Sequence, residues 1–197
     1  ENLSEKPTSK IAGIVLAAGA SRRAGPVNKL LIDIDGRGMV AVTTATTLAA
    51  GLDPVLVVTG FEAAAVAAAV ANLDVRCIHN PQHQEGMAGA IRHGVAALGA
   101  DVAAVLICLG DMPWVKPATL IALVDAFDAA AGREICRPVM SGKSGNPVLF
   151  GRRFFPALGG LQGDRGAKAV IDEHSQVVVN VAVDDAGIFK DLDVPDT

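Results

Sequence analysis

The stretch Ile11–Leu31, IAGIVLAAGASRRAGPVNKLL, joins a short run of apolar residues to a loop of small residues and cations. Its first six residues, IAGIVL, have the length and composition of a buried β-strand. The loop that follows places Arg22, Arg23 and Lys29 among glycine and alanine residues, which let a backbone approach a ligand closely. Exposed backbone amides and mobile cations together suit a polyphosphate. The stretch therefore predicts a strand that ends in a phosphate-binding loop, with a solvated turn as the alternative.

Apolar runs of this kind alternate along the chain with stretches of helical composition. The strand candidates are Ile11–Leu16, Val55–Thr59, Val75–His79, Val102–Leu109, Ile135–Val139, Pro147–Phe150 and Val177–Val183. The helix candidates are Met39–Ala50, Glu62–Ala71, Met87–Leu98, Pro117–Ala131 and Gly166–His174. Continuous apolar strands that are separated by helices are typical of a parallel sheet covered on both faces. The expected fold class is α/β, with three α/β/α layers and a mostly parallel central sheet.

Length, charge and cysteine content set further bounds. A chain of 197 residues can bury its own core, and we expect a single domain over 11–197 after a flexible, polar lead-in at 1–10. The net charge of -4 gives no general attraction to nucleic acid or to anionic membranes. No apolar run approaches the roughly 20 residues that span a bilayer. The widely spaced Cys77, Cys108 and Cys136 favour buried free thiols and a cytoplasmic location.

Asp111 is the strongest candidate for a metal ligand. It follows the strand candidate Val102–Leu109 and lies between Gly110 and Pro113, which places its carboxylate on a rigid strand end. In open parallel sheets, ligands bind beyond the carboxyl ends of the strands. Mg²⁺ prefers one or two protein carboxylates together with substrate phosphates and water. The position therefore predicts a magnesium ligand, and a turn cap before Pro113 is the alternative.

Two familiar nucleotide-binding patterns do not fit this chain. A Walker A loop needs G-x-x-x-x-G-K-[ST], whereas five residues separate Gly19 from Gly25 and the lysine comes four positions later. A dinucleotide fingerprint needs G-x-G-x-x-G and an acidic residue at the end of the second strand, and neither is present at Val55–Gly60. An NAD-dependent oxidoreductase is therefore disfavoured.

The segment LAAGASRRAGPVNKLL, which starts at Leu16, resembles the first motif of the MobA-like nucleotidyltransferases. The resemblance continues in chain order through NPQHQEGMAGAIRHG, LGDMPWV, GNPVLF, GDRGAKAVI and DLDVPD, so it covers nearly the whole chain after residue 10. The ending NKLL is similar to the molybdenum cofactor cytidylyltransferase branch. The resemblance implies a Rossmann-like nucleotidyltransferase fold. It also implies transfer of a nucleoside monophosphate from an NTP to an acceptor, with release of pyrophosphate.

The resemblance further implies roles for individual residues. The nucleotide would contact Leu16, Ala17, Ala18, Gly19, Asn80 and Gly110. The triphosphate would meet Arg23 and Lys29, which act with Asp111 in catalysis. A second metal-binding carboxylate would come from Asp191 or Asp193, which alternation along an extended segment places on the same side. The acceptor would contact Gly145, Asn146, Pro147, Asp164 and Gly166.

The implied acceptor is the terminal phosphate of molybdopterin, which is ionised at neutral pH and needs no general base. Guanylyl-transferring relatives typically have Gly-Gly where this chain has Ala18-Gly19, and one methyl group discriminates between substrates by about 1 to 3 kcal/mol. We therefore expect Mg²⁺-dependent transfer of CMP from CTP to molybdopterin, with a molybdoenzyme as the recipient of the product. A guanylyltransferase, a sugar-phosphate nucleotidyltransferase and a non-catalytic delivery module for a molybdoenzyme are the alternatives.

Some residues near these motifs have two readings. Trp114, the single tryptophan, follows GDMP and either stacks on a pterin or packs in the core. His79 and His83 flank Asn80-Pro81, where surface or supporting roles are favoured over substrate contact. Relatives often have serine near Gly89 and Ala90, so this chain lacks hydroxyl groups that those relatives carry.

Overall fold

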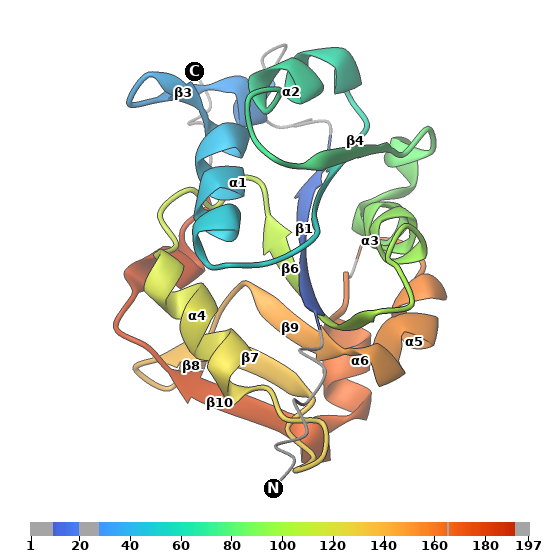
Figure 1. Cartoon of the computed structure of the whole chain (residues 1–197), viewed down its shortest axis with the longest axis vertical. Coiled ribbons are helices and arrows are strands. Elements are labelled where there is room, and N and C mark those ends of the chain that lie inside the picture. The colour runs from blue at the N-terminus through green and yellow to red at the C-terminus, as the bar shows by residue number, and fades with distance from the viewer. Residues whose placement is uncertain (1–9, 20–27, 165, 192–197) are drawn as a thin grey trace, which may run out of the picture.

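The computed structural model describes residues 10–19, 28–164 and 166–191 and has one central β-sheet (Figure 1). The strands of this sheet are β1 (Lys10–Ala17), β4 (Val55–Thr59), β5 (Arg76–His79), β6 (Val102–Leu109), β7 (Ile135–Met140), β8 (Lys143–Ser144), β9 (Val148–Gly151) and β10 (Val178–Ala182). Their order is β10-β7-β9-β6-β1-β4-β5, and β8 pairs with β7. A separate small hairpin joins β2 (Asp33–Ile34) to β3 (Arg37–Gly38). Each of the seven predicted strands is present.

The main sheet is parallel except at β9 and the short β8. β9 runs antiparallel to both β6 and β7, whereas β1 pairs in parallel with β4 and β6. A continuous apolar run identifies a buried strand but not its direction. Because β9 runs the other way, the loop before it lies at the edge where the parallel strands end. The predicted mostly parallel sheet is confirmed, and this reversal brings the segment 145–147 to the carboxyl edge.

Helices cover both faces of the sheet, which confirms the three α/β/α layers (Figure 1). They are α1 (Met39–Ala49), α2 (Ala63–Ala69), α3 (Met87–Ala96), α4 (Pro117–Ala126), α5 (Phe155–Gly159) and α6 (Lys168–Glu173). Successive side chains of a strand point to opposite faces. Thus Val15 and Ala17 join the apolar cluster beneath α1, α2 and α4, while Ala12 and Ile14 join the cluster beneath α3, α5 and α6.

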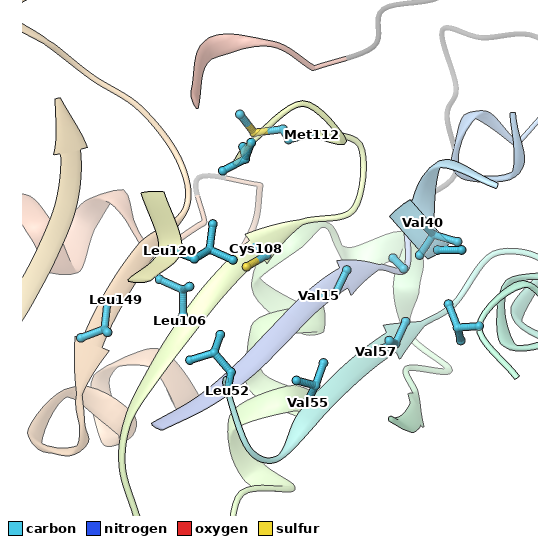
Figure 2. Packing of buried hydrophobic residues seen from close by; sticks show 14 of the residues in the cluster. Val15, Val40, Leu52, Val55, Val57, Leu106, Cys108, Met112, Leu120 and Leu149 are labelled. Atoms are coloured by element: carbon cyan, nitrogen blue, oxygen red, sulfur yellow. The ribbon is translucent and has the colours of Figure 1, made fainter. Parts of the chain in front are cut away.

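The first of these clusters packs directly behind the end of β6. Figure 2 shows Val15, Val57 and Leu106 on one face of the sheet, together with Cys108, and Met112 in the turn that follows β6. Met112 is 5% exposed. The apolar contacts of Met112 therefore hold the backbone directly after Asp111 against the core.

The prediction of a helix over Pro117–Ala131 is wrong for its last five residues, 127–131. The helix α4 ends at Ala126, because Asp128 and Arg133 exchange backbone hydrogen bonds of 2.9 Å in both directions across a turn. An ion pair of 3.2 Å between the same two side chains accompanies this turn. Helix α5 was not predicted, because its five residues are too few for a helical period to be read.

The cysteines only partly follow the prediction. Cys108 and Cys136 are buried, and burial raises the pKa of their thiols to about 12 and about 11 respectively. Cys77 is exposed, so the prediction of a buried thiol is wrong there, because β5 is the last strand at its side of the sheet. Neighbouring atoms still shield the Cys77 thiol from part of the solvent, and this desolvation raises its pKa as well.

The chain termini are only partly described. Residues 1–9 and 192–197 lie outside the described residues, and Lys10, the last residue of the predicted lead-in, already belongs to β1. The division into a lead-in and one domain over 11–197 stays a prediction. In the described part of the chain, no helix combines the length and the apolar character that a membrane span requires.

Candidate active site

Lys29 and Asp111 form an ion pair at the carboxyl edge of the sheet. The Lys29 Nζ atom lies 2.6 Å from the Asp111 Oδ2 atom, and the two side chains are 21% and 20% exposed. Asp111 follows β6, and Lys29 opens the short 3-10 helix η1 (Lys29–Leu31) after the loop that leaves β1. Because β1 and β6 are neighbours in the sheet, their following segments meet. The two residues predicted to share a phosphate chain and a metal ion are therefore in contact and open to solvent.

Gly110 fixes the position from which the Asp111 side chain leaves the sheet. Its N–H donates to the Leu16 carbonyl oxygen at 3.0 Å, and its own carbonyl oxygen accepts a hydrogen bond of 3.2 Å from the Thr43 Oγ1 atom. A Cβ atom at position 110 would lie 2.7 Å from the Leu16 oxygen, which is closer than real Cβ contacts. Only glycine at position 110 allows the backbone after β6 to approach the end of β1 this closely. Gly110 thus fixes the backbone from which the Asp111 side chain extends.

Gly110→Ala is expected to lower the free energy of unfolding by about 1 to 3 kcal/mol, because overpacking against a backbone oxygen forces the strands apart. For a chain of this length that corresponds to a melting temperature lower by about 3 to 9 °C. Thermal unfolding followed by circular dichroism measures the change. Gly159→Ala is the matched control, since no heavy atom lies within 4 Å of a Cβ atom built there. Equal melting temperatures for the two variants would show that position 110 has room for a side chain.

Asn28 positions Lys29 and was missed in the sequence. It is 3% exposed, and its Oδ1 atom accepts a hydrogen bond of 3.1 Å from the Leu30 N–H at the start of η1. Among the residues that the structure describes, its Nδ2 atom has no hydrogen-bond partner. Asparagine is a preferred residue before the first turn of a helix, so the letters NKLL carried this signal.

The predicted nucleotide-binding residues of β1 lie at the same edge. Leu16 and Ala17 end the strand, Ala18 is 4% exposed, and Gly19 is exposed. The Ala18 carbonyl oxygen accepts a hydrogen bond of 3.2 Å from the Phe61 N–H after β4. The methyl group of Ala18 packs in the apolar cluster under α3, beside a glycine at position 60 that has no space for a Cβ atom. The end of β1 is thus fixed against the core at Ala18.

Asn80 lies after β5 and is completely buried. Its N–H donates to the Thr59 oxygen at 2.8 Å, and its Oδ1 atom accepts from the Gln82 N–H at 3.0 Å. Its Nδ2 atom has no partner in the described ranges and lies 3.2 Å from where a Cβ atom of residue 89 would stand. A side chain at position 89 would therefore crowd the Asn80 amide group, and glycine avoids this contact. His79 is exposed and His83 is half-buried, and their roles stay predictions.

The predicted acceptor residues form two groups. Gly145, Asn146 and Pro147 precede β9, and the Asn146 N–H donates to the Ile188 carbonyl oxygen at 3.0 Å. Asp164 and Gly166 lie between α5 and α6 in sequence and pack against the start of α3. Asp164 leaves no room for a Cβ atom at Gly86, and Met87 leaves none at Gly166. The first group therefore lies before β9, and the second lies beside the start of α3. Among the described residues, no backbone hydrogen bond joins one group to the other.

Trp114 is 41% exposed, so the reading of this residue as part of the core is wrong. It follows Asp111 by three positions, and its carbonyl oxygen lies against Gly187. The indole is therefore available at the edge of the site.

The chemistry of the donor set fits a magnesium ion. Asp111 supplies one carboxylate that is partly open to solvent, and the exposed Asp191 is the described residue of the predicted C-terminal pair. Within the described ranges, no group of three or more His, Cys, Asp or Glu side chains could hold a metal by itself. Mg²⁺ needs only one or two protein carboxylates when phosphates and water complete its shell. Arg22, Arg23 and Asp193 lie outside the described residues, and their roles stay predictions.

Three solved structures resemble this fold closely. Rv0371c from Mycobacterium tuberculosis has a TM-score of 0.78 at 30% identity, with 89% of this chain and 88% of that chain covered. Its complex with manganese has a TM-score of 0.72 at 28% identity and covers 88% of each chain. A nucleotidyl transferase from Methanothermobacter thermautotroptrophicus has a TM-score of 0.76 at 26% identity, with coverage of 89% and 88%.

Similarity to curated proteins extends over most of the sequence. The chain is 30% identical to the purine catabolism protein PucB of Bacillus subtilis (strain 168), over 94% of this chain and 93% of PucB. It is 29% identical to the nicotine blue oxidoreductase of Paenarthrobacter nicotinovorans, over 93% and 92%. It is 31% identical to the bifunctional protein GlmU of Sorangium cellulosum (strain So ce56), over 92% of this chain but only 39% of GlmU. A sequence model of the MobA-like NTP transferase domain matches residues 13–177. The chain therefore belongs to the MobA-like NTP transferase family and is a nucleotidyltransferase.

Proposed function

We propose that this protein transfers CMP from CTP to the terminal phosphate of molybdopterin in a Mg²⁺-dependent reaction that releases pyrophosphate. The observation that carries the proposal is the contact between Lys29 and Asp111 at the carboxyl edge of the sheet. A cation and a metal-binding carboxylate at one place are what a nucleotide's phosphate chain requires. The resemblance of NKLL to the cytidylyltransferase branch supports the choice of this reaction within the family.

The two side chains would act by positioning charge. Lys29 is proposed to neutralise phosphate oxygens, and Arg23 is proposed to do the same from the preceding loop. Asp111, with Asp191 or Asp193, would hold Mg²⁺, which stabilises the negative charge that develops during attack on the α-phosphate. An acceptor phosphate is already ionised at neutral pH, so the residues need only align two anions. No base among the side chains is then required.

The ion pair also fixes where the Lys29 and Asp111 side chains lie relative to each other. At 2.6 Å, Lys29 neutralises Asp111 where the metal would otherwise sit. With a nucleotide and its metal bound, Lys29 would contact phosphate and Asp111 would hold the metal. Opposite charges at contact distance interact at several kcal/mol at an effective dielectric constant of about 20. Each of the two side chains would then keep a partner of opposite charge.

Specificity for CTP rests on the base side of the site. We infer it from Ala18, whose methyl group is absent from the Gly-Gly pattern of guanylyl-transferring relatives and here packs in the apolar cluster under α3. The similarity to GlmU keeps a sugar-phosphate nucleotidyltransferase as the alternative. A molybdoenzyme is the proposed recipient of the product, and the cytoplasm is the proposed location. A delivery module without turnover is the remaining alternative.

Pyrophosphate release tests the reaction directly. The full chain is incubated with Mg²⁺, molybdopterin and either CTP, GTP, ATP or UTP under anaerobic conditions, and pyrophosphate is measured by a coupled assay. We expect release with CTP and molybdopterin, and at least about tenfold less with each other nucleotide. Release with UTP and a sugar phosphate would favour the sugar-nucleotide alternative. Stabilisation by CTP in a thermal-shift assay without any release would favour the delivery module.

A further inference from the structure

We propose that Asp185 is a positioning residue that holds the 3-10 helix η5 (Ala186–Phe189) between the loop of Asp111 and the segment 145–147, and thereby sets the metal affinity of Asp111. The inference rests on the proposed metal-dependent function. It concerns a residue that neither binds the nucleotide nor contacts Asp111 itself. Its effect is transmitted through the backbone contacts of η5.

Asp185 is a buried carboxylate with a complete set of donors. It is 2% exposed. Its Oδ2 atom accepts hydrogen bonds from the Lys116 N–H at 2.9 Å and from the Thr119 Oγ1 atom at 2.6 Å. Its Oδ1 atom accepts from the Gly187 N–H at 2.9 Å. One carboxylate therefore ties the first turn of α4 to the first turn of η5.

These hydrogen bonds are charge-assisted and are not balanced by a cation in the described part of the chain. The nearby Lys116 Nζ atom donates instead to the Asp184 carbonyl oxygen at 3.1 Å. Hydrogen bonds to an ionised acceptor are about twice as strong as those between neutral groups. A buried charge that depends on three fixed donors tolerates little movement of either element. Asp185 thus makes the placement of η5 relative to α4 precise.

Helix η5 in turn contacts both the loop after β6 and the segment 145–147 before β9. Gly187 lies so close to the Trp114 carbonyl oxygen that no Cβ atom would fit. The Ile188 carbonyl oxygen accepts the hydrogen bond of 3.0 Å from the Asn146 N–H, and Gly145 packs directly on Ile188. Helix η5 therefore contacts both the loop that carries Asp111 and the segment before β9. Moving η5 would move both.

The same element leads to the second candidate metal ligand. Asp191 follows Phe189 by two positions, and it is exposed. Asp111 and Asp191 come from segments that are 80 positions apart, so only tertiary contacts can hold them in register. The contacts of Asp185 and Gly187 are such contacts. The residues of the base side, Asn80 and Ala18, hydrogen-bond to other elements.

Binding of Mn²⁺ alone to the full chain tests this proposal without any need for turnover. Free Mn²⁺ is measured by its electron paramagnetic resonance signal, and the fluorescence of Trp114, the single tryptophan, reports on the loop after Asp111. We expect Asp185→Asn to raise the Kd for Mn²⁺ about tenfold, as for loss of a hydrogen bond to a charged group, and to shift the emission of Trp114. Asp184→Asn is the matched control, because its side chain is exposed and next in sequence. It should leave both signals unchanged.

A second pair of variants covers the case in which Asp185→Asn does not fold. Thr119→Val removes one donor to Asp185, whereas Thr119→Ser retains the hydroxyl group. We expect weaker Mn²⁺ binding for the valine variant and recovery of most of the affinity in the serine variant. Folded Asp185 and Thr119 variants that bind Mn²⁺ as the unaltered protein does would overturn the positioning role. An unaltered protein that binds no Mn²⁺ would instead overturn the proposed metal site, and with it this inference.

Discussion

Asp111→Asn is expected to lower the rate of nucleotidyl transfer by at least about 1,000-fold while the protein stays folded, because the proposed metal ligand is lost and an amide takes its place. The ion pair with Lys29 is partly open to solvent, and exposed pairs contribute only about 0 to 1 kcal/mol to stability. The melting temperature should therefore change by no more than about 3 °C. Pyrophosphate release under saturating CTP and Mg²⁺ measures the rate.

The chain offers a matched control for this variant at the other end of β6. Asp101 lies just before β6 and pairs with Lys10 at 3.3 Å, whereas Asp111 lies just after β6 and pairs with Lys29. A hydrogen bond from its own backbone and, after it, the Lys10 side chain lower the pKa of the Asp101 carboxyl group. Asp101→Asn should leave turnover unchanged, because it removes an acid from the opposite edge of the sheet. Near-normal turnover in Asp111→Asn would show that Asp111 does not hold the metal.

Lys29→Met should have opposite effects on two ligands. Without the cation, phosphate oxygens lose a charged partner, and kcat/KM for the nucleotide should fall by about 100- to 1,000-fold. Mn²⁺ alone should bind more tightly, by about tenfold, because the positive charge that competes for Asp111 is gone. Steady-state kinetics and Mn²⁺ titration measure the two effects.

Lys10→Met is the corresponding control for the cation. Lys10 begins β1, and its pKa is raised chiefly by its hydrogen bond to Asp101 and by the charge of Asp53. Its removal should alter neither the kinetics nor Mn²⁺ binding. If Lys29→Met weakened Mn²⁺ binding instead, Lys29 would act as a structural support of Asp111 and not as its competitor.

The sequence predicted those features that depend on local patterns. The strand Val102–Leu109 was predicted at its exact bounds, because a continuous run of apolar residues ends at a Gly-Asp turn. The placement of Lys29 beside Asp111 followed from the rule that loops after parallel strands share one edge. The direction of β9 was not predictable, since the same apolar run serves a buried strand of either direction.

The residues that support the site depend on distant partners and were missed for that reason. Asp185 bonds to Thr119 and Lys116 over 66 and 69 positions. Nothing in the local letters VDDAG distinguishes a buried carboxylate from a solvated one. The roles of Arg23 and Asp193 stay predictions, because these residues lie outside the described ranges.

The exposure of Cys77 has a practical consequence for following the reaction. Cys77 lies on β5 three positions before Asn80, and the other two thiols are buried. A maleimide dye would therefore attach at one place on the base side, more readily as the pH rises and the thiolate forms. The single indole lies in the segment after β6, and β1 and β4 separate β6 from β5 in the sheet. Energy transfer from that indole to the dye would report movement between the segment after β6 and strand β5 in an otherwise unaltered chain.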